Sequence, residues 1–398
     1  MIEKGYECTG CTMRLFDYTG INLPEKNTCC GLADVQDAQE VAKSLGMEFR
    51  VLNYMDAFRR DVMDKFVREY QRGRTPNPCI DCNRYMKFGL LWEWAKENGY
   101  DVIVTGHYSR VGYDAEQGRW YLEKAVDPAK DQSYVLYGMT QEQLAHTMFP
   151  VGEVQDKEQV RRIAEAHGFV NSKKPDSQDI CFVPEGTYAD FIERQTGQVP
   201  EHGRFVDEEG RVLGEHKGLV RYTIGQRKGL GLALEHPMYV KDKDLEKNEV
   251  ILTSSDGLFS DTLIAEDFNW IWTPDWKATA PDGAGAPKAG TPKAGALTAD
   301  VSEADAPKAD ALTACVSKAD APKAGAPKAD APKAGSQLEV MAKPRYRAPE
   351  AAATARVLED GRVEIRFHEP QRALTTGQAV VLYAGNRVVG GGTIAEVP

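Results

Sequence analysis

Two cysteines, Cys79 and Cys82, lie in the stretch RTPNPCIDCNRYMK, residues 74–87, which has the residue types best suited to chemistry. Two prolines within residues 75–78 fix φ and favour extended backbone before them, so this part is predicted to be a stiff loop. The amphipathic run that follows predicts a helix whose N-terminus lies at or near Cys82. The partial positive charge of a helix N-terminus and the nearby basic side chains favour thiolate over thiol there.

This stretch alone leaves three interpretations open with about equal weight: a reactive thiol, a metal ligand and ordinary core cysteines. Cys8 and Cys11 form a second CxxC pair, and a zinc site built from Cys8, Cys11, Cys79 and Cys82 is a strong ligand pattern. However, residues 6–14 read as an apolar strand, and cysteine commonly behaves as a small core residue. We therefore expect strand packing rather than metal binding for Cys8 and Cys11.

The composition is that of a globular protein with room for two or three domains, since 42% of the 398 residues are hydrophobic and 27% are charged. No apolar run approaches the ~18 residues of a membrane span, and the N-terminus lacks a signal-peptide core. The eight cysteines are therefore expected in a reducing, cytoplasmic setting, with no membrane partner. A formal net charge of -11 argues against nucleic-acid binding over the whole protein surface but allows a local basic groove.

Strands and helices alternate in the first part of the chain, which predicts an α/β domain with a parallel sheet. Ligands of such sheets bind beyond the carboxyl ends of the strands, where Gly106 and His107 follow the third strand. Position alone gives His107 modest weight, because a histidine after a strand is more often structural. The predicted strands are residues 6–14, 48–52 and 101–105, and the predicted helices are 34–45, 57–70 and the segment from Asn83 to about Gly99.

The later chain is β-rich and contains a compositional break. Residues 222–231, YTIGQRKGLG, are predicted to be a basic, glycine-spaced loop, which could either contact RNA phosphates or be a solvated turn. Between about 278 and 336 the sequence is dominated by Ala, Pro, Lys, Gly and Asp. Within this segment ALTADVSEADAPKAD is followed directly by the similar unit ALTACVSKADAPKAG. Such a repeat lacks the large apolar side chains of a core, so it is predicted to be a disordered insertion in which Cys315 is incidental.

Several motifs, in one order, resemble those of the bacterial tRNA-specific 2-thiouridylases. The motifs are TPNPCIDCNRYMKFG, VTGHYSR, KDQSYVLYGMTQEQL, DSQDICF, YTIGQRKGLG, RYRAP, PQRALTTGQAVVLY and GGGTI. The resemblance covers the chain except for the insertion. It implies an α/β PP-loop ATPase domain (adenine nucleotide alpha hydrolase-like) over residues 1–195, a small central β-rich domain over 196–260, and a C-terminal β-barrel over 261–398 that the insertion interrupts.

The resemblance implies ATP-dependent 2-thiolation of the wobble uridine, U34, of tRNA. Cys82 would be the first catalytic cysteine and Cys181, in DSQDICF, would carry a persulfide. ATP would make the C2 oxygen a leaving group, because an amide-like carbonyl is a poor electrophile. Attack of the Cys82 thiolate on the persulfide is ordinary exchange chemistry and would end in a Cys82–Cys181 disulfide. The base would have to leave the anticodon stack.

The same resemblance assigns further contacts. Met13 and Gly106 would line the nucleotide site for ATP, with Mg²⁺ expected, and Asn77, Pro78 and Cys79 would contact the target base. The implied partners are tRNA and a cysteine desulfurase or sulfur-relay protein. The further residues that would contact tRNA are His107, Lys130, Asp131, Gln132, Arg345, Tyr346 and Gln378.

Two departures from the family pattern bear on mechanism. Many members have Asp where this chain has Cys79, so Cys79, Cys82 and Cys181 are candidate ligands of a [4Fe–4S] cluster. In addition, the family's first strand, its SGGVDSS-type phosphate loop and most of the following helix do not occur in the sequence. Either the start codon is assigned too late, which the intact downstream motifs favour, or the chain is a catalytically inactive tRNA-binding remnant.

Overall fold

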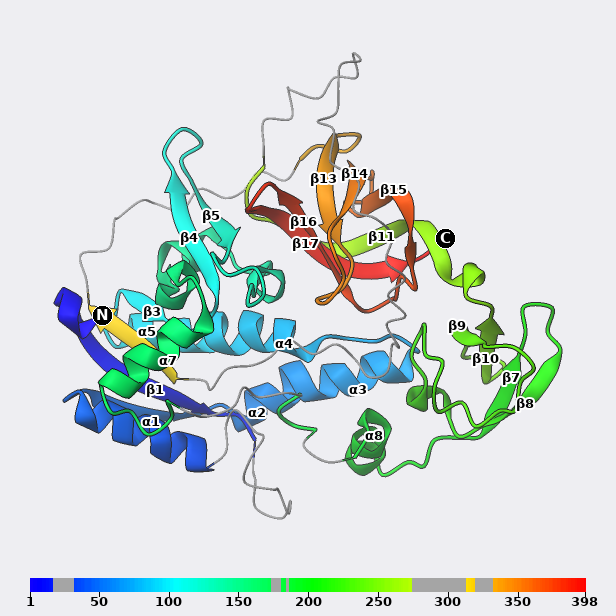
Figure 1. The fold of residues 1–398 in the computed structure, drawn as a ribbon, viewed down its shortest axis with the longest axis horizontal. Helices are drawn as coiled ribbons and strands as arrows, with labels where there is room; N and C mark the ends of the chain where they lie inside the picture. The colour runs from blue at the N-terminus through cyan, green and yellow to red at the C-terminus, as the bar shows by residue number, and fades with distance from the viewer. Residues whose placement is uncertain (17–31, 173–179, 184–185, 274–312, 319–331) are drawn as a thin grey trace.

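The computed structural model describes residues 1–16, 32–172, 180–183, 186–273, 313–318 and 332–398. Three sheets, of five, four and eight strands, are arranged around the central helices α3 (Asp64–Gln71) and α4 (Pro78–Asp81) (Figure 1). The side chains of α3 that are buried include Phe66, Val67 and Tyr70, so one stripe of this helix faces the core.

The five-stranded sheet belongs to the N-terminal part of the chain and has the order β2-β1-β12-β3-β6. β1 pairs with β2 in parallel, and β3 pairs with β6 in parallel, which confirms the predicted α/β class with parallel strands. Helix α1 (Leu32–Ser44) packs beside β1 and β2. The strands are β1 (Glu7–Arg14), β2 (Glu48–Asn53), β3 (Val102–Val104), β6 (Thr147–Met148) and β12 (Thr313–Lys318).

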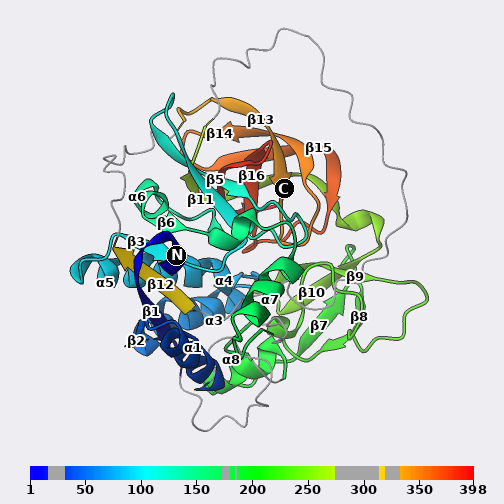
Figure 2. The same cartoon turned by 60° about the vertical axis from the view of Figure 1, so that its left-hand side comes forward.

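Strand β12 comes from the low-complexity segment that the sequence predicts to be disordered. It lies between β1 and β3 and is antiparallel to both (Figure 2). For these six residues the prediction is therefore wrong, and Cys315 is at an interior sheet position, in register with Gly10 and Val104. Backbone pairing on both sides explains how a strand forms here without large apolar side chains. Residues 278–312 and 319–331 of the predicted insertion lie outside the described part of the chain.

Two long helical stretches each contain a π-helical segment. Helix α2 (Met55–Phe58) continues through the π-helix Arg59–Met63 into α3, and α4 continues through the π-helix Cys82–Leu90 into α5 (Leu91–Glu97). π-helical turns are frequent at functional sites, and the second of these segments begins at Cys82. Among the described residues no helix is long and apolar enough to cross a membrane. The remaining α-helices are α6 (Gln141–Ala145), α7 (Lys157–Ala166) and α8 (Tyr188–Thr196).

The C-terminal strands form a six-stranded closed barrel, because β11 pairs with both β15 and β17. This confirms the predicted β-barrel. A hairpin from an earlier part of the chain extends the same sheet, because its second strand pairs with β17. The hairpin consists of β4 (Ser109–Asp114) and β5 (Arg119–Lys124). The barrel strands are β11 (Phe259–Trp270), β13 (Gln337–Lys343), β14 (Ala351–Val357), β15 (Val363–Arg372), β16 (Ala379–Ala384) and β17 (Arg387–Glu396).

The four-stranded sheet has its own small core and presents the basic loop at residues 222–231. Tyr222, Ile224 and Leu230 of this loop are buried in that core, whereas Arg227 and Lys228 are exposed. The loop is therefore anchored by its apolar residues and carries its charges outward. The strands are β7 (Gly203–Val206), β8 (Val212–His216), β9 (Tyr239–Asp244) and β10 (Glu249–Thr253).

Candidate functional site

The helix that carries both cysteines of the CxxC pair begins one turn earlier than predicted. Asn77 is its N-cap and accepts a hydrogen bond from the backbone N–H of Cys79 at 3.2 Å, while Pro78 occupies the first helical position. Cys79 therefore lies in the first turn, and Cys82 is the first residue of the π-helical segment. Both side chains are half-buried. The positive end of the helix consequently lies nearer to Cys79 than to Cys82.

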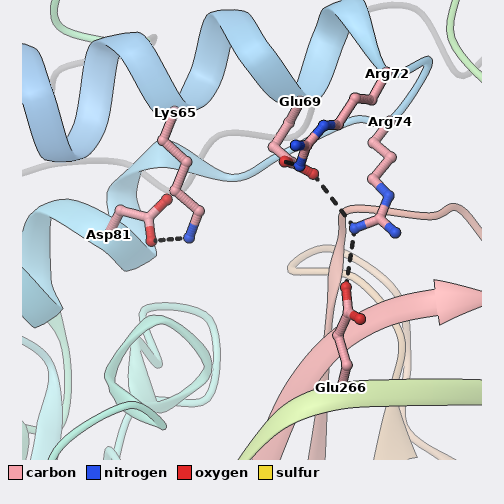
Figure 3. Close-up of polar contacts among 6 residues, drawn as sticks. All are labelled: Lys65, Glu69, Arg72, Arg74, Asp81 and Glu266. Carbon is pink, nitrogen blue, oxygen red and sulfur yellow. Dashed lines mark hydrogen bonds and ion pairs between the residues drawn. The ribbon is translucent and has the colours of Figure 1, made fainter.

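The residue before Cys82 fixes this helix to α3. Lys65 Nζ lies 2.8 Å from Asp81 Oδ1, and the Asp81 side chain is almost fully buried (Figure 3). Burial raises the pKa of Asp81, whereas the Lys65 ammonium and the Arg84 guanidinium act in the opposite direction. A buried carboxylate needs such a partner, so the pair holds α4 in a fixed position relative to α3.

Cys181 lies in the short described segment 180–183, which is anchored by the aromatic ring of Phe182. That ring contacts Phe58 at a centroid distance of 5.8 Å, Phe66 at 5.3 Å and Phe191 at 5.1 Å. Cys181 itself is half-buried against the same core as Cys82. Residues 176–179 of the motif DSQDICF lie outside the described part of the chain.

The two predicted catalytic cysteines are thus attached, through their neighbours, to consecutive residues of one helix. Lys65 of α3 binds Asp81, which precedes Cys82, and Phe66 packs on Phe182, which follows Cys181. Helix α3 is therefore the element that positions both cysteines. Lys65 and Phe66 were not singled out from the sequence, because nothing in the helical pattern of residues 57–70 indicates which residues they contact.

Cys82 and Cys181 are not joined to each other, so the disulfide that the resemblance implies is not formed in this structure. Among the described residues no group of three or more His, Cys, Asp or Glu side chains is placed to hold a metal ion. Neither the zinc set nor the set of three cluster ligands, Cys79, Cys82 and Cys181, forms such a group. Cys11 is instead buried in β1, where strand packing was expected.

The proline loop before the cysteines is docked onto the C-terminal barrel. The backbone N–H of Thr75 donates to the carbonyl of Thr376 at 2.9 Å, and Gln378 Nε2 donates to the carbonyl of Thr75 at 2.8 Å. Arg74 reaches Glu266 of β11 at 2.9 Å (Figure 3). The loop predicted to contact the target base is therefore held between α3 and the barrel.

Several residues predicted to contact tRNA form hydrogen bonds that join separate segments of the chain. Tyr346 donates from its hydroxyl to the carbonyl of Asp131 at 3.3 Å, and Gln132 Oε1 accepts from the backbone N–H of Tyr108 at 2.9 Å. Arg345 donates to Thr375 Oγ1 at 3.2 Å, close in sequence to Gln378. The segment 130–132 is thus bonded to Tyr346, which lies between β13 and β14 of the barrel.

His107 is buried and both of its ring nitrogens have protein partners. Nε2 lies 3.2 Å from Lys87 Nζ and Nδ1 lies 2.7 Å from Thr105 Oγ1. Since an ammonium group can only donate, Nε2 accepts and Nδ1 carries the proton. Burial, and secondly the charge of Lys87, hold the pKa of His107 well below its usual value. In this conformation His107 bonds within the protein, as do Gln132 and Gln378, and their contact with tRNA stays a prediction.

The two residues assigned to the nucleotide site lie at the carboxyl ends of strands of the five-stranded sheet. Met13 is near the carboxyl end of β1, and Gly106 follows the carboxyl end of β3. Since β12 separates the two strands, they lie roughly 10 Å apart at two strand spacings. Met13 is buried, whereas Gly106 is exposed and a Cβ there would meet nothing within 4 Å. Gly106 therefore leaves open space beyond the carboxyl end of β3.

Comparisons with known proteins cover nearly the whole chain. Three family models match: "tRNA methyl transferase HUP domain" over residues 1–185, "tRNA methyl transferase PRC-barrel domain" over 189–254 and "Aminomethyltransferase beta-barrel domain" over 323–394. The tRNA-specific 2-thiouridylase MnmA of Lachnoclostridium phytofermentans is 41% identical over 395 residues, covering 99% of this chain and 94% of that protein. The chain belongs to the tRNA-specific 2-thiouridylase family.

Further members of the family align at similar length. The MnmA protein of Moorella thermoacetica is 42% identical over 395 residues, with 99% of this chain and 94% of the relative aligned. That of Carboxydothermus hydrogenoformans is 40% identical over 398 residues, with 100% and 93% aligned. The resemblance inferred from the motifs is therefore confirmed.

The buried state of His107 in this thiouridylase family member predicts a pH dependence of stability. The folded protein holds His107 neutral, whereas the unfolded chain protonates it below about pH 6.5. The unfolded state then binds more protons, so stability falls as the pH decreases, by up to about 1.4 kcal/mol per pH unit. Urea unfolding at pH 7.5 and 5.5 should show this loss, and His107→Gln should reduce it.

Because burial also lowers the pKa of His216, the control is the variant His216→Gln measured over the same pH range. Each substitution should remove its own part of the slope. An unchanged slope in His107→Gln would contradict the assignment of a neutral His107.

Proposed function

We propose that this protein is a tRNA sulfurtransferase that replaces the C2 oxygen of the wobble uridine, U34, with sulfur from a persulfide on Cys181. The observation that carries the proposal is the attachment of the Cys82 and Cys181 segments to Lys65 and Phe66 of α3. The names of the relatives, all of them thiouridylases, support thiolation over an RNA-binding protein without catalysis.

The sulfur step of the proposal uses the thiols of the two segments that are attached to α3. The Cys82 thiolate attacks Sγ of the Cys181 persulfide, and the terminal sulfur leaves with the electron pair of the broken S–S bond. That sulfur is the nucleophile delivered to C2 of the uridine. The two protein sulfurs are joined in a Cys82–Cys181 disulfide, whose reduction by two electrons from an external thiol restores the starting state.

The RNA side of the proposal rests on the proline loop and the surfaces around it. The base of U34 would leave the anticodon stack and lie against Asn77, Pro78 and Cys79, since a modified base must leave its stack. Asn77 Nδ2 is buried and has no hydrogen-bond partner among the described residues, so it is available to a carbonyl group of the base. The exposed cations Arg227 and Lys228 are suited to contact phosphates. The sulfur donor would be a cysteine desulfurase or a sulfur-relay protein.

ATP would supply activation by converting the C2 oxygen into a leaving group. Met13 and Gly106 lie at the carboxyl ends of β1 and β3, where a nucleotide would bind. The sequence given has no SGGVDSS-type loop to bind the phosphates, so we derive no step through ATP. We predict that the 398-residue chain, given tRNA, ATP and Mg²⁺, releases no AMP above background. Thin-layer chromatography of radiolabelled ATP tests this, and tRNA-stimulated AMP release would contradict it.

The thiolation proposal is tested in a bacterial strain whose own thiouridylase gene is deleted. The gene is introduced once as the 398-residue frame and once with the genomic DNA that precedes codon 1. Mass spectrometry of tRNA nucleosides should detect 2-thiouridine in at least the second strain. Its absence in both strains, with tRNA binding retained by the purified protein, would favour an RNA-binding protein without catalysis. Thiolation by the 398-residue frame would show that the missing loop is dispensable.

A further inference from the structure

Ala373 has a backbone conformation that alanine rarely adopts. Its φ is +52°, and the other non-glycine residues with positive φ in the described part of the chain are Asn248 and Asp267. Asparagine and aspartate tolerate this conformation because their short polar side chains can hydrogen-bond locally, which an alanine cannot do. Such an unfavourable conformation persists only where the surrounding contacts determine it, and residues of this kind cluster at functional sites. The contacts of Ala373 therefore identify what its conformation holds in place.

Although Ala373 directly follows barrel strand β15, its side chain packs in the core of the four-stranded sheet. It is buried there with the apolar residues that anchor the basic loop, residues 222–231, and its backbone N–H donates to the carbonyl of Leu258 at 2.7 Å. A Cβ built on Gly225 of the basic loop would lie 2.9 Å from Cβ of Ala373. The basic loop therefore approaches Ala373 more closely than a residue with a side chain would allow.

The carbonyl group of Ala373 is held by two side-chain donors. The Arg345 guanidinium donates to it from the connection between β13 and β14, and Thr375 Oγ1 donates to it at 2.8 Å. Arg345 also donates to Thr375 Oγ1 at 3.2 Å, so the three residues form a closed set of hydrogen bonds. The Ala373 peptide is therefore fixed on both sides, by the core behind the basic loop and by Arg345.

The other end of the same short segment, residues 373–378, holds the proline loop. The carbonyl of Thr376 accepts from the backbone N–H of Thr75 at 2.9 Å, and Gln378 Nε2 donates to the carbonyl of Thr75 at 2.8 Å. Backbone bonds of 2.8 Å join Gly377 and Gln378 to Ile394 of β17, which ties this end to the barrel. Residues 373–378, named the bridging segment below, thus connect the basic loop to the proline loop through one buried stretch of chain.

We propose that the bridging segment fixes the position of the basic loop relative to the proline loop, with Ala373 as the positioning residue, so that one RNA contacts both loops at a set separation. The inference rests on the proposed function for the RNA itself, whose target base would lie at the proline loop. Arg227 of the basic loop is exposed and would bind a phosphate of the same molecule. Because the link is short and buried, the two contacts are already aligned in the free protein, which lowers the entropy cost of binding.

The first test is hydrogen–deuterium exchange of the full chain without RNA, and its readout is the amide of Thr75. In Gly225→Ala the new Cβ would clash with Cβ of Ala373 and displace the bridging segment. We expect the protection of the Thr75 amide to fall roughly tenfold or more, while the barrel strands β13 and β14 keep theirs. Unchanged protection of Thr75 in Gly225→Ala would overturn the proposal.

Gly210→Ala is the matched control for the cost of a side chain at positive φ. Gly210 lies between β7 and β8 of the same four-stranded sheet and has φ +81°, and nothing lies within 4 Å of its added Cβ. This variant should keep the Thr75 amide as protected as in the wild type. If it instead lowered the protection of Thr75 as much as Gly225→Ala does, the effect would not come from the contact with Ala373, and the proposal would be wrong.

The double variant Gly225→Ala/Ala373→Gly separates the contact from general misfolding. Ala373→Gly removes the atom that the new Cβ would meet, and glycine readily adopts the positive φ of this position. Protection of the Thr75 amide should therefore return to the level of Gly210→Ala. A double variant that exchanges at Thr75 as fast as Gly225→Ala would refute the role of the contact between Gly225 and Ala373.

The second test measures tRNA affinity by filter binding in a double-mutant cycle. Arg227→Ala should weaken binding by a severalfold larger factor in the wild type than in Gly225→Ala, because only the wild type holds both contacts at the right separation. Equal factors in the two backgrounds would overturn the proposal. A wild type that binds no tRNA would contradict the proposed function instead, and the exchange measurement, which contains no RNA, would still decide whether the two loops are linked.

Discussion

Replacing Cys82 with serine should trap sulfur on Cys181, whereas replacing Cys181 with serine should prevent sulfur from being loaded at the site. The reason is that only a thiolate attacks the sulfur–sulfur bond efficiently, while a serine hydroxyl stays protonated at neutral pH. Release of sulfide from the loaded protein should fall by roughly a hundredfold or more in Cys82→Ser. This half of the reaction requires neither ATP nor tRNA, so the phosphate loop does not affect the result.

The measurement is intact-protein mass spectrometry after incubation with cysteine and a cysteine desulfurase. The wild type should release sulfide and gain a Cys82–Cys181 disulfide, Cys82→Ser should retain one added sulfur on Cys181, and Cys181→Ser should do neither. Cys8→Ser is the matched control, because Cys8 lies on β1 outside the α3-anchored segments and should leave the outcome unchanged. Sulfide release from Cys181→Ser at the wild-type rate would contradict the role of Cys181.

Cys79→Ser distinguishes a two-thiol site from a three-thiol site. Cys79 lies in the first turn of the helix and is not adjacent to Asp81. The ion pair between Lys65 and Asp81 fixes the residue that directly precedes Cys82. We therefore expect Cys79→Ser to form the Cys82–Cys181 disulfide as the wild type does. If Cys79→Ser instead behaved like Cys82→Ser, the attacking thiol would have been assigned to the wrong cysteine.

The local parts of this site could be predicted from the sequence because each rests on neighbouring residues. The prolines, Asn77 and the amphipathic run indicate a loop followed by a helix. The helix differs in beginning at Pro78 and in containing the π-helical segment Cys82–Leu90. The parallel sheet and the barrel follow from the periodicity of the strands. The cysteines were identified by their motifs, and their separate anchors on α3 were not, because Lys65 and Phe66 look like ordinary residues of an amphipathic helix.

The contacts that join distant segments could not be predicted. Gln378 and Thr75 are 303 residues apart, and no pattern in either segment indicates the other. Strand β12 is a sharper case, because it comes from a low-complexity segment whose composition predicts no regular structure. The β4–β5 hairpin likewise joins the barrel sheet through a tertiary pairing that its own sequence does not encode.

The contact between the proline loop and the barrel should be lost in the variant Gly377→Ala. Gly377 has φ +88°, and a Cβ there would lie 2.8 Å from the backbone nitrogen of Thr75 and 2.9 Å from Cβ of Arg74. A backbone neighbour cannot move aside as a flexible side chain can. Residues other than glycine cost roughly 1–2 kcal/mol at such a φ, and overpacking adds about 1–3 kcal/mol. The loop must therefore shift, or the protein loses roughly 3 kcal/mol of stability.

Gly385→Ala is the matched control, because Gly385 also has a positive φ, +60°, but nothing lies within 4 Å of its added Cβ. It should lose only the conformational part, roughly 1–2 kcal/mol in urea unfolding. Gly377→Ala should in addition weaken tRNA binding by roughly tenfold or more in a filter-binding assay, because the loop that holds Asn77, Pro78 and Cys79 is displaced from the barrel. If the two variants bind tRNA equally well, docking on the barrel does not position the loop for RNA, and the loop would have to be ordered by the RNA itself.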